Sequence, residues 1–431
     1  MFAKLPLYFQ YLGFTIVYHI LKGVTGVRLC ASARDFSEKS FMRFVLVSII
    51  CFLLLPSCVK CEMVNRSKNE VNDTKNGDSI DIIDPIRLRA EEIAEGLDDR
   101  LLSAQVLISG IEGKGKLNDN VVALLTEFPA GGIMLFRYNL DDDNDSIRAL
   151  LSQTSALVTG GAGIPPFIAV DHEGGTVNRF RRGTAGLPSA ESYWELALTQ
   201  DRQTALEKLE SDSFRAGREL KDLGINLNFA PVAEYLNDAN RIFLQSRSYG
   251  PDSLFTADAA SAFISGMERA GVLCVIKHFP GSAGNDPHYS ASVLGADKGA
   301  LDNIVYPFTF LISRNRARAV MAAHTAVPAL DTKIASLSQV VMKDWLRDEI
   351  GFNGILIADD FSMASAGGQT PESSAIMSVI AGADMVLVWP KDLRRTHSAF
   401  TAAIQDGRLS RERMRSAAKR IIYEKILLGL L

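Results

Sequence analysis

Residues 277–290, KHFPGSAGNDPHYS, bring together side chains that can carry charge or exchange protons. Lys277 and His278 follow the apolar run VLCVI, which is typical of a buried strand, and Asp286 and His288 lie in the loop beyond. An aspartate near a histidine can hold one tautomer of the imidazole, and histidine exchanges protons near neutral pH. The stretch predicts a ligand-binding strand end followed by a loop that carries a proton donor. A solvated loop histidine is the alternative.

Four more candidate residues follow other apolar runs. Asp171 follows FIAV, His324 follows VMAA, and Asp359 and Asp360 follow GILIA. A carboxylate in the place of Asp171 can accept hydrogen bonds from sugar hydroxyls or can cap a helix. His324 is a core histidine or a substrate contact, and paired aspartates indicate a nucleophile or a metal ligand. Because the chain shows no further metal-like cluster, the nucleophile is the better interpretation.

Arginines and one glutamate near these runs are additional candidates. Arg247, in RIFLQSRSYG, offers a planar fork of donors suited to hydroxyls or carboxylates. Arg179 and Arg182, in NRFRR, can be ligand contacts or surface charges, and Glu234 can be a hydrogen-bond partner.

The elements that must position these residues alternate regularly along the chain. Amphipathic segments such as 145–158 and 253–270 separate short runs that are apolar on both faces, as in buried parallel strands. Repeated strand–helix alternation predicts a (β/α)8 barrel, with the polar residues at strand ends meeting at one mouth. The predicted strands are 104–109, 131–136, 166–170, 225–230, 272–276, 319–323, 354–358 and 384–389.

Composition limits the class of partner. The chain has 431 residues and a formal charge of −4, without a long basic run, so no electrostatic footprint for nucleic acid is present. Of five cysteines only Cys274 lies in the body, and no Cys/His spacing is typical of zinc. We expect a small or neutral ligand, no cofactor, no metal and a monomeric protein.

The N-terminal region predicts export. Residues 42–58, MRFVLVSIICFLLLPSC, resemble a bacterial lipoprotein signal whose Cys58 becomes the lipidated first residue, although Pro56 departs from the usual pattern. An uncleaved membrane anchor is the alternative. Either interpretation places the body outside the cytoplasm, attached to a membrane on its periplasmic or cell-surface side.

The remaining organisation follows from composition. Met42 can be the true start, which would make residues 1–41 an upstream extension. Residues 59–84 are polar and lack a hydrophobic period, as in a flexible tether. Residues 85–431 form the predicted barrel domain.

The ordered motifs resemble one known family. KHFPG with a downstream Asp-x-His, AVDHEGG, NFAPV, RSYG, AHTAVPALD, ASLS and GFNGILIADDFSM occur across the body of the chain. This set resembles the bacterial β-N-acetylglucosaminidases of glycoside hydrolase family 3. The resemblance implies one (β/α)8 barrel and an exo-acting, retaining enzyme that removes terminal β-linked GlcNAc, for example from peptidoglycan fragments or chitin oligomers.

The resemblance also implies roles for individual residues. Asp359 is the nucleophile that forms a covalent glycosyl intermediate, and His288, held by Asp286, is the acid/base. The sugar-binding residues would be Asp171, Arg179, Arg247, Lys277, His278 and His324.

Several positions depart from the family's pattern and leave alternatives open. Ser282 replaces a loop histidine in a shortened loop, Thr176 an arginine, Ala358 a serine or threonine, and Glu234 an aspartate. One alternative is a β-N-acetylglucosaminide phosphorylase, because a histidine acid/base repels phosphate less than a carboxylate does. Another is a surface sugar-binding lipoprotein without turnover.

Overall fold

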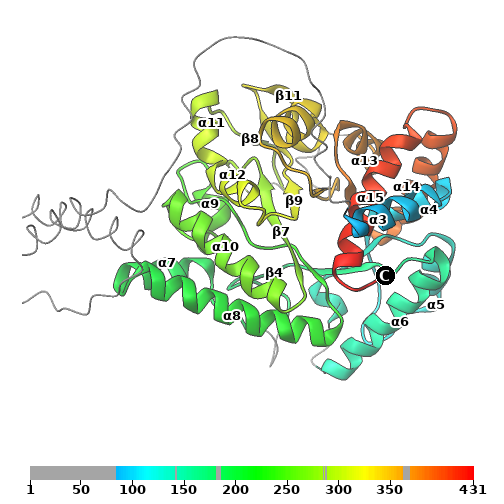
Figure 1. The fold of residues 1–431 in the computed structure, drawn as a ribbon, viewed down its shortest axis with the longest axis horizontal. Coiled ribbons are helices and arrows are strands. Elements are labelled where there is room, and N and C mark those ends of the chain that lie inside the picture. The colour runs from blue at the N-terminus through cyan, green and yellow to red at the C-terminus, as the bar shows by residue number, and fades with distance from the viewer. Residues whose placement is uncertain (1–83, 141–142, 181–185, 285, 287–288, 363–368) are drawn as a thin grey trace, which may run out of the picture. The chain divides into compact units, whose positions relative to one another are not determined.

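The structure is a computed structural model that describes residues 84–431 except 141–142, 181–185, 285, 287–288 and 363–368 (Figure 1). The predicted extension, signal and tether therefore lie outside the described residues, apart from Asp84 at the end of the tether. Within the described ranges, no helix is both long enough and apolar enough to cross a membrane.

Eight parallel strands close into a barrel in the order β1-β13-β12-β9-β7-β6-β3-β2. Closure is made by β1, which pairs with β13 at Leu107 and Val386 and with β2 at Ile108 and Gly132. The strands are β1 (Leu107–Gly110), β2 (Gly132–Leu135), β3 (Phe167–Val170), β6 (Leu227–Asn228), β7 (Leu273–Phe279), β9 (Ala319–Ala322), β12 (Ile355–Ala358) and β13 (Met385–Val388).

Helices follow the strands and cover the outside of the barrel, so both faces of the sheet are buried (Figure 1). The α-helices are α3 (Pro85–Glu95), α4 (Asp99–Gln105), α5 (Asp119–Glu127), α6 (Asn144–Ala162), α7 (Ala190–Thr199), α8 (Arg202–Leu223), α9 (Arg241–Leu244), α10 (Ser253–Arg269), α11 (Lys298–Ile304), α12 (Tyr306–Ser313), α13 (Pro371–Ala381), α14 (Pro390–Gln405) and α15 (Arg411–Leu427). Short 3-10 turns occupy η1 (Arg137–Asn139), η2 (Gln245–Arg247) and η3 (Ala335–Leu337), and η4 (Val340–Glu349) is a π-helix.

The predicted (β/α)8 barrel is confirmed, and each predicted apolar run overlaps one barrel strand. Two runs, 104–109 and 272–276, were misplaced at their ends. Residues 104–105 end α4, whose start is capped by Asp98, which accepts a hydrogen bond from the Leu101 amide at 2.8 Å. Strand β7 continues to Phe279, so Lys277 and His278 lie inside the strand rather than beyond it. A charged strand end of this kind is stable only because partner carboxylates surround it.

Two small sheets lie beyond the barrel strands. β4 (His172–Gly174) and β5 (Val177–Asn178) form a hairpin, and β8 (Ser292–Val293), β10 (Thr325–Val327) and β11 (Asp331–Ile334) form a second sheet. The hairpin needs glycine at Gly174, where φ is +98° and an added Cβ would lie 2.2 Å from the Pro188 carbonyl oxygen. Gly175 follows in the turn between the two strands, at a φ of +53°.

The first and last helices of the described chain lie side by side (Figure 1). Glu91 of α3 forms an ion pair with Lys419 of α15 at 2.6 Å, and Tyr423 donates a hydrogen bond to Asp84 at 3.1 Å. Asp84 also accepts hydrogen bonds from the first turn of α3. Contacts between residues far apart in sequence thus fix the start of the barrel domain.

Candidate active site

A chain of buried and half-buried ion pairs crosses the C-terminal mouth of the barrel between β3 and β7. Lys277 donates to Asp171 at 2.8 Å and to Glu173 at 2.7 Å. Arg247 donates to both oxygens of Glu173, each at 2.8 Å, and Arg179 donates to Asp171 at 2.9 Å. Three segments that are distant in sequence therefore meet at one site, as predicted for polar residues at the ends of barrel strands.

Charge in this network keeps its carboxylates ionised. Burial alone raises the pKa of Asp171, but Lys277 and Arg179 outweigh it, and the pKa lies below the usual value. The pKa of Glu173 is also lowered, because Arg247 and Lys277 both face the carboxylate and overcome its desolvation. Lys277 has only 4% of its side chain exposed, and its ammonium forms ion pairs with both carboxylates.

Glu234 organises the next layer of the site. Its Oε1 accepts from Nδ1 of His278 at 2.7 Å and from the His278 amide at 3.1 Å. Its two oxygens also accept from the backbone amide and hydroxyl of Ser282. Burial tends to raise the pKa of Glu234, but the bonds from His278 and Ser282 lower it. One buried carboxylate thus fixes the end of β7 and the start of the following loop, confirming Glu234 as a hydrogen-bond partner.

The loop after β7 is tied at its other end as well. The Ser292 hydroxyl donates to the Ala283 carbonyl at 2.9 Å and lies 3.0 Å from the Thr325 hydroxyl. The Asp286 carbonyl accepts from the Tyr289 amide at 3.0 Å. The predicted acid/base His288 lies outside the described residues.

The β12 end carries the two predicted aspartates. Asp359 Oδ1 accepts from the Asp360 amide at 2.8 Å, and the Asp359 amide donates to the Ala322 carbonyl of β9 at 3.4 Å. The Asp360 carboxylate accepts from the Ser362 hydroxyl at 2.7 Å and from the Trp389 indole N–H. Burial, with a smaller contribution from the Asp359 charge, raises the pKa of Asp360.

His324 supports this strand end from β9. Its Nε2 lies 2.9 Å from the Asp360 carbonyl, which can only accept, so this nitrogen carries a proton. In the neutral ring Nδ1 then accepts from the Ser336 hydroxyl at 2.6 Å. Both ring nitrogens thus bond to protein atoms, and the geometry makes His324 a support for the aspartate pair. Its role as a sugar contact stays a prediction.

The structure brings Asp171, Arg179, Arg247, Lys277 and His278 into one contiguous set and places Asp359 on another strand end of the same mouth. Sequence reasoning missed Glu173, the shared partner of Lys277 and Arg247. Its place in the sequence could have revealed it, because Glu173 lies two residues after Asp171, directly beyond β3. Arg182 lies outside the described residues.

The described residues contain no group of three or more His, Cys, Asp or Glu side chains arranged to hold a metal ion. Cations instead neutralise the buried carboxylates of the mouth. The fold is a (β/α)8 barrel with carboxylates gathered at the C-terminal ends of its strands, where enzymes of this fold carry their active sites.

Comparison with known proteins gives the family. Residues 97–423 match the glycosyl hydrolase family 3 N-terminal domain. The chain is 35% identical over 265 residues to a β-hexosaminidase of Neisseria gonorrhoeae, an alignment that covers 60% of this chain and 71% of that protein. The chain therefore belongs to glycosyl hydrolase family 3 and is a glycoside hydrolase.

Solved structures agree with this assignment. A family 3 β-N-acetylglucosaminidase from a Paenibacillus species superposes with a TM-score of 0.72 and 28% identity, covering 78% of this chain and 63% of that chain. A β-N-acetylhexosaminidase from Beutenbergia cavernae gives a TM-score of 0.68 and 27% identity, with 77% and 99% covered. Both likenesses confirm the barrel fold.

Proposed function

We propose that this protein is an exo-acting, retaining β-N-acetylglucosaminidase that removes terminal β-linked GlcNAc from glycans such as peptidoglycan fragments or chitin oligomers. The family and the names of its relatives support the activity. The observation that carries the proposal is the pairing of a carboxylate at the β12 end with a buried ion network at the β3 and β7 ends of the same mouth.

The ion network suits a neutral, polyhydroxylated ligand. Each oxygen of Asp171 has one protein donor, and a carboxylate offers about four lone-pair positions, so capacity remains for sugar hydroxyls. Lys277, Arg247 and Arg179 are donors held in fixed places by carboxylates. In this account Asp171, Lys277, Arg247, Arg179 and His278 bind the cleaved sugar.

Asp359 is the proposed nucleophile. Its carboxylate attacks the anomeric carbon, the bond to the leaving oxygen breaks, and a glycosyl ester forms. His288, supported by Asp286, gives its proton to the leaving oxygen and then takes one from the water that hydrolyses the ester. Asp360 is less suited to the attack, because its carboxylate accepts three hydrogen bonds, from the Ser362 amide, the Ser362 hydroxyl and the Trp389 indole N–H.

We further propose that the protein is exported and anchored to a membrane through lipidated Cys58 or an N-terminal anchor, and that it acts as a monomer. The sequence of residues 42–58 supports the anchor. Membrane fractionation of cells expressing the wild-type chain or Cys58→Ala tests it: loss of membrane association in the variant supports lipidation. Retention would support the uncleaved anchor, and recovery of wild-type protein in the cytoplasm would contradict export.

The activity is tested with the full chain and a chromogenic β-N-acetylglucosaminide. We expect turnover in wild type, near-complete loss in Asp359→Asn, and loss in His288→Ala that azide restores by replacing water as the nucleophile. Assays in phosphate buffer separate the alternatives, because GlcNAc 1-phosphate as product would make the protein a phosphorylase. Saturable GlcNAc binding without turnover would make it a sugar-binding protein.

A further inference from the structure

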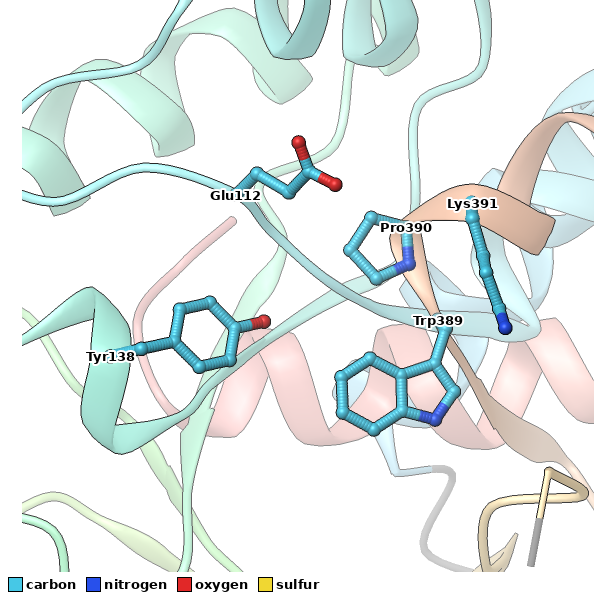
Figure 2. A pocket seen from close by; sticks show the side chains of 5 residues that line it. All are labelled: Glu112, Tyr138, Trp389, Pro390 and Lys391. Atoms are coloured by element: carbon cyan, nitrogen blue, oxygen red, sulfur yellow. The ribbon is translucent and has the colours of Figure 1, made fainter.

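A pocket lies among the segments that follow β1, β2 and β13 (Figure 2). It has a volume of about 320 Å³, near the lower end of the range of roughly 300–1,000 Å³ for small-molecule sites. Its lining residues come from the segments that directly follow β1, β2 and β13, including η1 and the start of α14, and are Glu112, Tyr138, Trp389, Pro390 and Lys391. In the barrel order these strands occupy the arc between β12, which carries Asp359, and β3, which carries Asp171. The pocket therefore belongs to the barrel mouth.

Aromatic rings form one side of this pocket. Phe136 stacks on Trp389 with ring centroids 4.9 Å apart and on Tyr138 at 5.6 Å, and the planes of both pairs are within 9° of parallel. Gly110 allows this packing, because an added Cβ would lie 3.0 Å from the Phe136 ring and 3.2 Å from Pro390. The Tyr138 ring lines the pocket while 49% of the residue stays exposed, so it is available to a ligand.

Hydrogen bonds hold the loops of the pocket in place. The buried Asn139 side chain donates to the Ile111 carbonyl at 2.8 Å and to the Gly113 carbonyl at 3.0 Å, and it accepts from the Phe136 amide at 2.9 Å. The loop that carries Glu112 is thus fixed to the loop that carries Tyr138. A rigid pocket of this kind loses little entropy when it binds a ligand.

The pocket is joined to the nucleophile strand through Trp389. Its indole N–H donates to the Asp360 carboxylate and to the Ser362 hydroxyl, which lies 2.7 Å away. Asp360 directly follows Asp359 in the sequence. One lining residue of the pocket, Trp389, therefore bonds to the neighbour of the proposed nucleophile.

The chemistry of the lining fits a pyranose ring. Aromatic faces pack against the C–H face of a sugar, while Glu112 can accept hydrogen bonds from hydroxyl or acetamido groups and Lys391 can donate them. One side chain of each charge favours an uncharged sugar over an ionic one.

We propose that this pocket, which we call the shelf subsite (Glu112, Tyr138, Trp389, Pro390 and Lys391), binds the first sugar of the leaving group. The inference rests on the proposed exo action. An exo enzyme cleaves the terminal sugar, so any second sugar that it contacts belongs to the leaving side. The shelf subsite makes the protein a better catalyst for oligosaccharides than for simple alkyl glycosides.

The test compares kcat/KM for N,N′-diacetylchitobiose and for methyl β-N-acetylglucosaminide, with GlcNAc release as the readout. Both leaving groups are alcohols, so the ratio of the two values reports binding of the second sugar. The first variant is Tyr138→Ala, which removes the aromatic ring. The second is Glu112→Gln, which removes the charge of the side chain but keeps its shape. Trp389 is left intact because it contacts Asp360. Tyr306→Ala is the matched control, because Tyr306 lines a different surface pocket, formed around α12.

We expect Tyr138→Ala to lower kcat/KM for the disaccharide by about tenfold while the value for the methyl glycoside stays unchanged. Glu112→Gln should lower the same value less, and Tyr306→Ala should change neither. Equal losses on both substrates would show that the pocket serves the cleaved sugar and would overturn the inference, as would no change in either variant. A wild-type protein that releases GlcNAc from neither substrate would contradict the proposed function itself.

Discussion

The buried Lys425 provides a quantitative test of the packing at the end of the barrel where β1 and β3 begin. Its side chain is fully buried in α15, its ammonium donates to Gln105 Oε1 at 2.8 Å, and it lies 5.1 Å from the centre of the Phe167 ring. These partners, within the described chain, are neutral. Desolvation therefore lowers the pKa of Lys425 from 10.5 to about 7.

The sign of the effect follows from proton binding. Between pH 7 and 10.5 the unfolded chain holds a proton on Lys425 that the folded protein lacks, so this residue makes the free energy of unfolding rise with pH. The slope is about 1.4 kcal/mol per pH unit, and the full difference is about 5 kcal/mol. Below pH 7 the ammonium is charged in both states and the folded protein carries the whole desolvation cost.

Lys425→Met should therefore stabilise the protein most at and below pH 7. The gain is about 2–4 kcal/mol, because Gln105 loses its donor at a cost of roughly 1–3 kcal/mol. Urea unfolding of both proteins from pH 6 to pH 10 gives the difference, which should shrink as pH rises. Lys419→Met is the matched control on the same helix, since Lys419 is one-third exposed and paired with Glu91. Parallel curves for wild type and Lys425→Met would refute the reasoning.

Three further predictions concern individual contacts. Glu173→Gln should weaken sugar binding and lower the free energy of unfolding by about 3–5 kcal/mol, because Lys277 and Arg247 lose a buried counter-charge; unchanged KM and stability would argue against it. Ser336→Ala should remove the donor to His324 and lower kcat several-fold, whereas an unaltered kcat would make this bond dispensable. Asp384→Asn should cost about 3–5 kcal/mol in urea unfolding with kcat retained at low temperature, because Asp384 is fully buried against Arg347, Arg413 and Arg420; a loss below about 1 kcal/mol would contradict it.

The barrel was predictable because its signal is local. A parallel strand buried on both faces must be an uninterrupted apolar run, and the runs at 166–170, 319–323 and 354–358 each enclose one observed strand. The run at 104–109 was misplaced at its start because Ala104 and Gln105 are compatible with a helix end as well as with a strand.

The sequence allowed several residues of the site to be named, but it did not show which of them contact one another. Asp171 and Lys277 could be named because each follows or ends an apolar run, yet their contact joins residues 106 positions apart. Arg247 and Glu173 are 74 positions apart, and charge alone does not select one carboxylate among the many in the chain. The shelf subsite was missed for a related reason: a tyrosine and a tryptophan after different strands indicate a shared pocket only once barrel closure makes β13, β1 and β2 neighbours.

The central claim is that Asp359 forms a covalent bond to the cleaved sugar. The most direct measurement is mass spectrometry of peptides after the full chain is incubated with a 5-fluoro N-acetylglucosaminide, whose glycosyl ester hydrolyses slowly. We predict one added fluoro-sugar on Asp359 and none in Asp359→Asn. A label on Asp360 would contradict it, as would turnover of the compound without any labelled peptide.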